Sequence, residues 1–495
     1  MELPALRLYS GPPCLPTSIP DHFLPSLSVV AMMRLIQCSS FLVFVNVMVA
    51  IAGSQSSTAA EAKRPNVILI MVDDFGYECV TANGGESYQT PVLDQLAATG
   101  LRFEHCHVQP LCTPTRVQLM TGRYNVRNYI NFGTLLRTET TFGNLMKQAG
   151  YATGIGGKWQ LGHEVDSPQH FGFDQSCLWQ QTRRPPRYAN PGLEYNGVEK
   201  DFNNGEYGPT LVNDFALDFI ANHSERPFFL YYPMILTHNP FQPTPDTPEW
   251  DPKVDDEQKK QNPKHFADMT VYMDKMIGRV VSKLEEMKIR ENTLLMVIGD
   301  NGTNTGITSR FQGHDYRGGK GTTTARGTHV PFIASWPAVI KAARISKDLI
   351  SSTDFLPTIC EAAGMAKPVD TDGVSFLSQL NGVAGTPREW LYSWYSPRQQ
   401  ADMKIREYAF DHSYKLYRSG EFFDLTADPF EKQALNRDSL GSKEKAAVAK
   451  LQPVLDQFSN VRPIELDHAF QQATGTGSTK VEKKKTKLEK KGKKT

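Results

Sequence analysis

The sequence predicts an α/β protein in which a large, mostly parallel sheet is flanked by helices on both faces. Two observations lead to this fold class. Residues 66–72 and 293–298 are continuous apolar runs, which are typical of strands buried on both faces of a parallel sheet. Strand-like and helix-like segments also alternate along most of the chain, as they do in α/β proteins.

Helix signals define the segments between these strands. Thr90 and Pro91 predict the start of a helix, and Gly100 predicts its end. Apolar residues between positions 266 and 287 recur at helical spacing, and the methionines among them are interpreted as core packing. The other expected elements are a helix at 141–149, a strand at 151–155, a helix at 214–222, a strand at 228–232, a strand at 330–336 and a helix that Thr353 and Asp354 cap and that ends near Gly364.

The pattern changes near residue 386. Four short strand-like segments joined by turns predict a small C-terminal antiparallel subdomain. They lie at residues 390–395, 408–411, 414–418 and 422–425. From residue 466 a tail is expected, and its lysine-rich run at 480–494 is interpreted as solvated and disordered, with an anchor for an anionic partner as the alternative.

Composition excludes several classes of protein. With 495 residues, 40% hydrophobic content and a net charge of +1, the chain is neither disordered nor fibrous and can bury one large core plus a smaller domain. The charge balance argues against a nucleic-acid or membrane-surface protein. The glycine-rich segments at 154–159 and 318–321 lack the spacing of dinucleotide and phosphate-binding loops, so neither nucleotide mechanism is supported.

The N-terminal region, residues 1–60, is interpreted as a signal for export. Met33 and Arg34 precede an apolar stretch that ends in small residues, and cleavage is expected between Ala52 and Ala60. The stretch is short for a membrane span, so a secreted or periplasmic protein without a stable span is predicted, with an uncleaved anchor as the alternative. Residues 1–32 fit no targeting pattern, which suggests that translation begins at Met32 or Met33.

Two acidic pairs follow the two buried strands. Asp73 and Asp74 come directly after the first strand, and Asp300 and Asn301 follow the later one. Ligand sites in open α/β sheets gather at the carboxyl ends of the strands. The first pair is therefore a candidate site for a hard cation such as Ca²⁺, and a polar turn is the alternative interpretation.

The stretch from Pro110 to Tyr124 reads PLCTPTRVQLMTGRY. Considered alone, Cys112 near Arg116 is either an activated thiol, because positive charge favours the thiolate, or a small hydrophobe packed beside Pro114. The order Cys-Thr-Pro-Thr-Arg, followed by Leu-Met-Thr-Gly, resembles the signature of the type I sulfatases, which are arylsulfatase-like enzymes. Thr115 stands where that family most often has serine.

This resemblance extends from about residue 64 to about residue 435. It implies an alkaline-phosphatase-like fold, with a catalytic domain at 61–385 and the small subdomain at 386–465, and the hydrolysis of sulfate monoesters of carbohydrates or aryl alcohols. In this family a formylglycine-generating enzyme oxidises the cysteine, so Cys112 would become Cα-formylglycine and present an aldehyde hydrate. Residues Asp73, Asp74, Cys112, Asp300 and Asn301 would surround Ca²⁺, for which Mg²⁺ is the less favoured alternative.

The resemblance also implies the roles of four further residues and a second role for Asp300. Lys158 in GYATGIGGKW and Lys320 in GGKGTT match lysines that contact sulfate, and His238 in LTHNPF resembles the histidine near the leaving group. Arg116 would steady the hydrate. One hydroxyl of the hydrate would attack sulfur with Asp300 as a proton acceptor, His238 would protonate the departing oxygen, and the second hydroxyl would expel sulfate.

The sequence departs from the family at Gln160, where the commoner residue after Lys158-Trp159 is histidine. A glutamine amide can hold the hydroxyl but cannot take its proton near neutral pH. Three explanations stay open: His163 takes the proton, water or Asp300 takes it, or turnover is impaired. Gln160 supports one alternative for the whole protein, a catalytically silent binder of sulfated glycans. A separate alternative is a phosphonate or phosphate ester hydrolase of the same superfamily.

The remaining cysteines and a basic loop leave further alternatives. If Cys112 is converted, four cysteines remain beyond the export region, and their even number permits two disulfides. They are Cys79, Cys106, Cys177 and Cys360. Another interpretation groups His105, Cys106, His107 and Cys112 as a soft-metal cluster, although the spacing matches no standard zinc pattern. Residues 183–187, RRPPR, form either a loop that contacts an anionic substrate or a plain surface loop.

Overall fold

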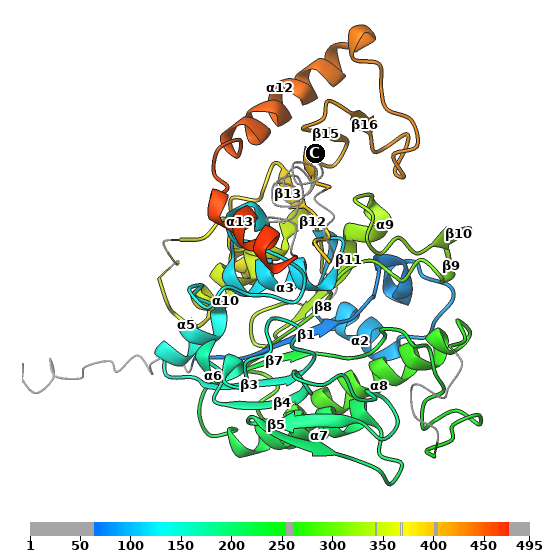
Figure 1. Ribbon diagram of the computed structural model, residues 1–495, viewed down its shortest axis with the longest axis vertical. Helices are drawn as coiled ribbons and strands as arrows, with labels where there is room; N and C mark the ends of the chain where they lie inside the picture. The colour runs from blue at the N-terminus through cyan, green and yellow to red at the C-terminus, as the bar shows by residue number, and fades with distance from the viewer. Residues whose placement is uncertain are drawn as a thin grey trace, which may run out of the picture. The chain divides into compact units, whose positions relative to one another are not determined.

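A ten-stranded sheet organises the chain in the computed structural model, which describes residues 64–474 apart from 254–260, 342–343, 367, 369 and 400–403 (Figure 1). The strand order is β12-β2-β11-β8-β1-β7-β3-β4-β5-β6. These strands are β1 (Asn66–Val72), β2 (Leu101–His107), β3 (Ala152–Gly157), β4 (Gln175–Trp179), β5 (Gly192–Tyr195), β6 (Val198–Asp201), β7 (Phe228–Pro233), β8 (Thr293–Gly299), β11 (His329–Ser335) and β12 (Arg344–Ser351).

The central strand β1 pairs in parallel with β7 on one side and with β8 on the other. All strands of this sheet run in one direction except β5 and β11. The predicted, mostly parallel sheet is therefore confirmed. The strand expected at 330–336 is present as β11, but it lies antiparallel between β8 and β2, an orientation that its apolar pattern does not encode.

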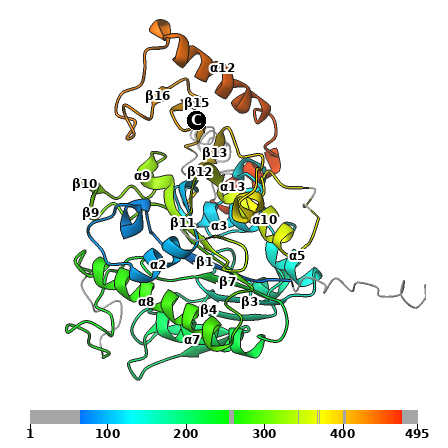
Figure 2. The ribbon, with the colours of Figure 1, turned by 180° about the vertical axis from the view of Figure 1, so that it is seen from behind.

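Helices cover both faces of the sheet (Figures 1 and 2). They are α2 (Pro91–Thr99), α3 (Cys112–Thr121), α4 (Asn125–Asn128), α5 (Phe142–Gln148), α6 (Ser167–His170), α7 (Gly208–Asn222), α8 (His265–Glu286), α9 (Ala325–Thr328), α10 (Phe355–Ala362) and α11 (Leu377–Asn381), with 3₁₀ turns at Tyr77–Cys79, Thr81–Asn83, Ser352–Asp354 and Arg437–Ser439. A hairpin of β9 (Thr308–Phe311) and β10 (His314–Arg317) stands apart from the main sheet.

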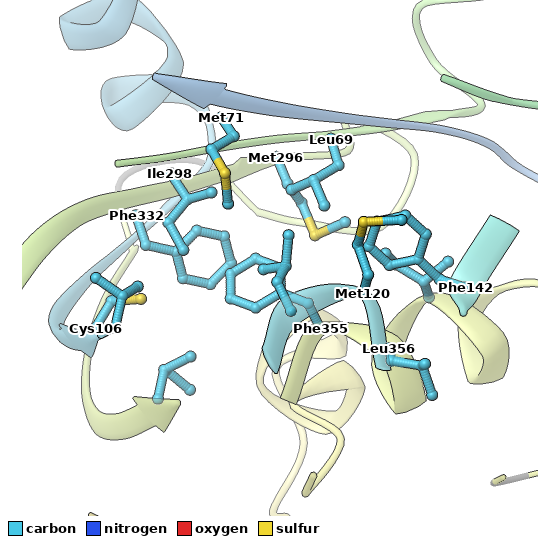
Figure 3. Close-up of a cluster of buried hydrophobic side chains, with 14 of the residues drawn as sticks. Leu69, Met71, Cys106, Met120, Phe142, Met296, Ile298, Phe332, Phe355 and Leu356 are labelled. Atoms are coloured by element: carbon cyan, nitrogen blue, oxygen red, sulfur yellow. The ribbon is translucent and has the colours of Figure 1, made fainter. Parts of the chain in front are cut away.

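The side chains of β1 alternate between two apolar cores. Leu69 and Met71 belong to a cluster with α3, α5 and α10, whereas Ile68 and Ile70 belong to a cluster with α2, α7 and α8. Figure 3 shows part of the first cluster, in which Met120 of α3 packs close to the strand side chains. Burial on both faces explains the continuous apolar run, since each fully buried side chain of this kind stabilises the fold by about 1.5–3 kcal/mol.

The predicted helix after Thr90 is confirmed, but its start is stabilised from elsewhere. The Thr90 side chain makes no capping hydrogen bond. Instead, the Asp274 carboxylate of α8 accepts hydrogen bonds from the backbone N–H groups of Val92 and Leu93, at 2.9 and 3.0 Å. The position after the helix requires glycine on steric grounds, because a Cβ on Gly100 would lie 2.4 Å from the Ala334 carbonyl oxygen of β11.

The predicted C-terminal antiparallel sheet is confirmed as β13 (Leu391–Tyr395), β14 (Arg406–Phe410), β15 (Tyr414–Tyr417) and β16 (Phe422–Asp424). Two helices that the sequence analysis did not predict follow it, α12 (Ser442–Gln457) and α13 (Ile464–Ala473). In α13, Leu466 and Phe470 pack with Ile130. The prediction that a tail begins at residue 466 is therefore wrong for the residues of α13. Residues 475–495 lie outside the described part.

The five described cysteines are buried and free, so the two disulfides that their number permits are not formed. Cys106 packs among apolar side chains (Figure 3). Within the described residues, the one group of acids, histidines and cysteines close enough to share a metal ion is Asp73, Asp74 and His238, which contradicts the soft-metal interpretation. The export region at 1–60 lies outside the described part, in which no helix has the length and apolar character to span a membrane.

Candidate active site

The two acidic pairs meet at the carboxyl ends of β1 and β8. The last residues of these adjacent strands, Val72 and Gly299, are partners in the sheet, so the residues that follow them lie side by side. Four side chains are gathered here, all with no exposed surface: Asp73, Asp74, Asp300 and Asn301. The backbone N–H of Asp74 donates to Asp300 Oδ1 at 3.0 Å, and Asn301 Nδ2 donates to Asp74 Oδ1 at 2.8 Å.

Three cationic side chains balance these carboxylates. Lys158 Nζ, directly after β3, lies 2.6 Å from Asp73 Oδ2, and Lys320 Nζ lies 2.6 Å from Asp74 Oδ1. Arg116 of α3 donates to Asp300 Oδ2 at 3.1 Å. A buried charge is tolerated only when it is paired and hydrogen-bonded, so these contacts hold the whole cluster together.

The cluster also fits a divalent cation. Asp73 Oδ1 and Asn301 Oδ1 are buried and have no hydrogen-bond partner within the described residues. Buried polar atoms of this kind need a partner, and carboxylate and amide oxygens are the ligands that Ca²⁺ takes. Ligand atoms of Asp73, Asp74 and His238 lie within 4.8 Å of one another. His238 was predicted near the leaving group, and its Nε2 is 3.9 Å from Asp74 Oδ2.

Burial and charge act in opposite directions on the acids. Burial alone would raise the pKa of Asp73, but the charges of Lys158, His238 and Arg116 outweigh it and hold that pKa well below its usual range. Burial raises the pKa of Asp300 to about 7, and the charge of Asp73 adds to this rise. The two neighbouring carboxyls therefore differ in proton affinity, as expected when like charges share a buried site.

Cys112 is the first residue of α3 and is 1% exposed. Its thiol donates to Gln160 Oε1 at 3.1 Å. Burial raises the pKa of the Cys112 thiol although Lys158 and Lys320 oppose the rise, so the hypothesis of an activated thiolate is not supported. Gln160 has a φ of 57°, in the left-handed region, and its amide is the hydrogen-bonding group in contact with position 112.

The two histidines occupy different places. His238 Nδ1 lies 3.1 Å from Arg187 Nη1 and 2.6 Å from the Asn239 carbonyl oxygen, and burial, with the charge of Lys158, lowers the His238 pKa to about 4. His163 is exposed, and its Nδ1 lies 2.8 Å from the Gln181 carbonyl oxygen. The role of His163 in proton transfer remains a prediction, since its described hydrogen bonds do not include Cys112.

A pocket of about 300 Å³ connects these groups to solvent. We define the pocket floor as five of its polar lining residues, Cys112, Lys158, Gln160, His238 and Lys320, together with the fully buried Asp73, Asp74, Asp300 and Asn301. We define the pocket rim as His163, Trp179, Gln181, Arg184 and Arg187. Phe132 and Gln399 also line the pocket, and no sequence signal pointed to them. For the rim, the sequence signal was the basic loop at 183–187, of which Arg184 and Arg187 line the pocket.

The C-terminal antiparallel sheet positions the loop that carries Lys320. Tyr395 of β13 donates to the Gly321 carbonyl at 3.3 Å, and the hydroxyls of Thr323 and Tyr417 are 2.8 Å apart. Lys415 of β15 is buried, donates to the Thr323 carbonyl and forms an ion pair with Glu431 at 2.7 Å. The subdomain is therefore part of the support of the pocket floor.

The fold and the pocket floor define a class first: an α/β protein of alkaline-phosphatase-like architecture, with acids at strand ends and a cysteine at a helix start. The family model described as Sulfatase matches residues 65–365, and the chain belongs to this family. It is a sulfuric ester hydrolase. A second model, N-sulphoglucosamine sulphohydrolase, C-terminal, matches residues 321–460.

Known relatives agree with this assignment. Arylsulfatase A of Homo sapiens is 32% identical over 75% of this chain and 78% of the relative. N-acetylgalactosamine-6-sulfatase of Canis lupus familiaris is 32% identical over 68% of this chain and 69% of the relative. A structure solved with its substrate D-glucosamine-2-N,6-O-disulfate has a TM-score of 0.68 at 22% identity, covering 81% of this chain and 99% of its own. Phosphonate monoester hydrolase of Agrobacterium radiobacter has a TM-score of 0.61 at 18% identity, covering 80% of this chain and 96% of its own.

Proposed function

We propose that this sulfatase releases sulfate from sulfated carbohydrates by means of formylglycine at position 112 and a Ca²⁺ ion. One observation carries the proposal: Cys112, in a sulfatase signature, shares a single pocket with Lys158, His238 and Lys320, above a buried acid cluster. A thiol whose pKa is raised by burial is a poor nucleophile, whereas the same position suits a modified residue.

A formylglycine hydrate would supply a nucleophilic hydroxyl and a second hydroxyl that allows sulfate to leave, and Ca²⁺ would supply fixed positive charge. The residues of the pocket floor do the rest. Lys158 and Lys320 place positive charge where sulfate oxygens would lie. His238 would donate to the departing oxygen, and because its lowered pKa leaves the ring neutral near pH 7, the donor would be an imidazole N–H. The Gln160 amide oxygen can accept a hydrogen bond from position 112, as it does from the thiol.

The cation would be held by oxygen atoms. Asp73, Asp74, Asp300 and Asn301 supply three carboxylates and an amide, and two of their oxygens lack a partner in the described structure. Ca²⁺ accepts six to eight oxygen ligands in flexible geometry, whereas Mg²⁺ requires near-ideal octahedral geometry. The crowded, carboxylate-rich cluster therefore favours Ca²⁺.

Carbohydrate substrates are supported by the relatives, which include an N-acetylgalactosamine-6-sulfatase. The C-terminal match to a sulphohydrolase of N-sulphoglucosamine supports the same class. Export through the N-terminal signal is part of the same proposal, and maturation would need a formylglycine-generating enzyme.

Mass spectrometry of the peptide that contains Cys112 tests the proposal, with protein made beside a formylglycine-generating enzyme. We expect an aldehyde at position 112 and calcium-dependent sulfate release from a sulfated saccharide. An unmodified thiol, under conditions that mature a control sulfatase, together with glycan binding and no sulfate release, would identify a silent binder instead.

A second candidate, a phosphonate ester hydrolase, is motivated by the likeness to the Agrobacterium radiobacter enzyme. Paired aryl sulfate and aryl phosphonate substrates separate the two. We expect a higher kcat/KM for the sulfate, and a reversed order would favour the second candidate.

A further inference from the structure

We infer that the pocket rim binds a second anionic group of the substrate, through Arg184 with Arg187 beside it. The preferred substrate is then a saccharide that carries another sulfate, or a carboxylate, close to the sulfate that is removed. This inference rests on the proposed function and names the substrate class more narrowly.

The first observation is the different fate of two neighbouring arginines. Arg183 is not among the residues that line the pocket, and its guanidinium is neutralised by ion pairs with Asp201 at 2.7 Å and with Glu199 at 3.2 Å. Arg184 lines the pocket. It is exposed and makes no ion pair with any carboxylate in the part of the chain that the structure describes.

The second observation is the charge of the pocket lining. Four lysine and arginine side chains line it, and none of the lining residues is acidic. Lys158 and Lys320, which are proposed to contact the sulfate that is removed, lie against the buried acids Asp73 and Asp74. Arg184 and Arg187 add positive charge at the rim, in addition to the two lysines of the floor. A one-signed cleft attracts an anion, and a guanidinium can bind sulfate or carboxylate in bidentate fashion.

The third observation is that the loop is already held in place. Trp179 Nε1 donates to the Pro185 carbonyl at 3.0 Å, and the Gly192 N–H donates to the Pro186 carbonyl at 3.1 Å. The Arg187 guanidinium lies over the Trp179 ring, 4.3 Å from its centroid. The backbone next to Arg184 therefore needs little ordering when a ligand binds, which favours affinity.

Arg187 connects the rim to the chemistry. Its Nη1 is 3.1 Å from His238 Nδ1, on the opposite side of the imidazole from the atom that faces Asp74. Arg187 is therefore unsuitable for a clean test. Arg184 has no contact with the pocket floor among the described hydrogen bonds and ion pairs, and its removal should leave the chemical step intact.

The test compares Arg184→Ala with the control Arg183→Ala, in matured, calcium-loaded full-length enzyme. The probes are 4-nitrophenyl sulfate and three disaccharides: one with a single sulfate, one with a second sulfate, and one with a uronate carboxylate. For at least one doubly anionic disaccharide, we expect Arg184→Ala to raise KM about tenfold with kcat little changed, the size of one charge-assisted hydrogen bond. Arg184→Lys should restore part of the loss.

The control substrates and the control variant give the opposing outcomes. We expect 4-nitrophenyl sulfate and the singly sulfated disaccharide to stay within about twofold of wild type, and Arg183→Ala to stay there with all probes. The disaccharide that loses affinity identifies sulfate or carboxylate as the second group. Equal losses on every substrate, no loss on either doubly anionic disaccharide, or equal effects of both variants would overturn the inference. If wild type releases no sulfate from any probe, the proposed function fails instead.

Discussion

The pocket floor and the pocket rim are built on opposite principles. The acids of the floor have no exposed surface and follow two adjacent strands, so the sheet fixes their positions. Arg184 and His163 of the rim are exposed and belong to loops whose attachments are backbone hydrogen bonds and a stacked ring. The difference teaches that the proposed chemistry is tied to the core, whereas the proposed selectivity belongs to loops that can vary at little cost to folding.

Replacement of Cys112 by alanine should give the largest effect, because the proposed nucleophile is formed at this position of the pocket floor. We expect Cys112→Ala to lower sulfate release on the order of 10⁴-fold or more, since no formylglycine can form. The melting temperature should change by only a few degrees, since the thiol makes a single described hydrogen bond. Residual turnover near the wild-type rate, measured by sulfate release, would show that the floor does not hold the nucleophile.

A weaker but still large effect is expected for the cation site. Asp74→Asn removes one carboxylate, and we expect calcium affinity to fall about 10- to 100-fold, with turnover falling in parallel and partly recovered by added calcium. The measurement is the rise of melting temperature with calcium concentration, which reports binding without activity.

The matched control for this site is Asp315→Asn, which removes an exposed carboxylate that pairs with Arg310. This variant should keep the calcium response of wild type. If Asp74→Asn also kept it, the buried acids would be a structural cluster and no cation site.

Gln160 belongs to the pocket floor and contacts Cys112, so its replacement tests what the floor requires at this position. We expect Gln160→His to leave the fold intact, because histidine is among the residues that tolerate a positive φ, and to preserve kcat or raise it by up to about tenfold. Gln160→Ala is the control that removes the amide acceptor without adding a base. A collapse of kcat in Gln160→His without unfolding would show that Gln160 has a role of its own.

The smallest effect on activity is expected for a substitution at Gly192, which contacts the loop that carries Arg184. A Cβ at Gly192 would lie 2.3 Å from Pro185 Cγ, so Gly192→Ala must displace the loop that carries Arg184. We expect KM for a doubly anionic disaccharide to rise about threefold and the free energy of unfolding to fall by about 1–3 kcal/mol. Gly306→Ala, in an exposed turn, serves as the control. An altered kcat for 4-nitrophenyl sulfate would mean that the rim reaches into the chemical step.

The same contrast decides what could be predicted from the sequence. Strands buried on both faces have a continuous apolar pattern, and acids directly after them must lie at one edge of the sheet. The meeting of Asp73 with Asp300 followed from that pattern and from the sulfatase resemblance. The calcium ligation and the catalytic roles stay predictions, because they concern groups that bind or are formed after folding.

Contacts between distant loops were beyond sequence reasoning. The approach of Arg187 to His238 spans 51 positions, and the Asp274 carboxylate caps α2 across more than 180 positions. Such contacts depend on the packing of whole elements, which no local spacing encodes. The antiparallel insertion of β11 was missed for the same reason, since its apolar pattern suits either direction.

The Lys320 loop contacts β13 and β15, which are synthesised after it. The ribosome produces the acids of the floor first and the strands that secure Lys320 about 70 to 100 residues after that lysine. Domains generally fold as units while the chain emerges. A nascent chain that ends before residue 391 lacks the strands that contact the Lys320 loop, so we expect its pocket floor to be completed only after those strands have been made.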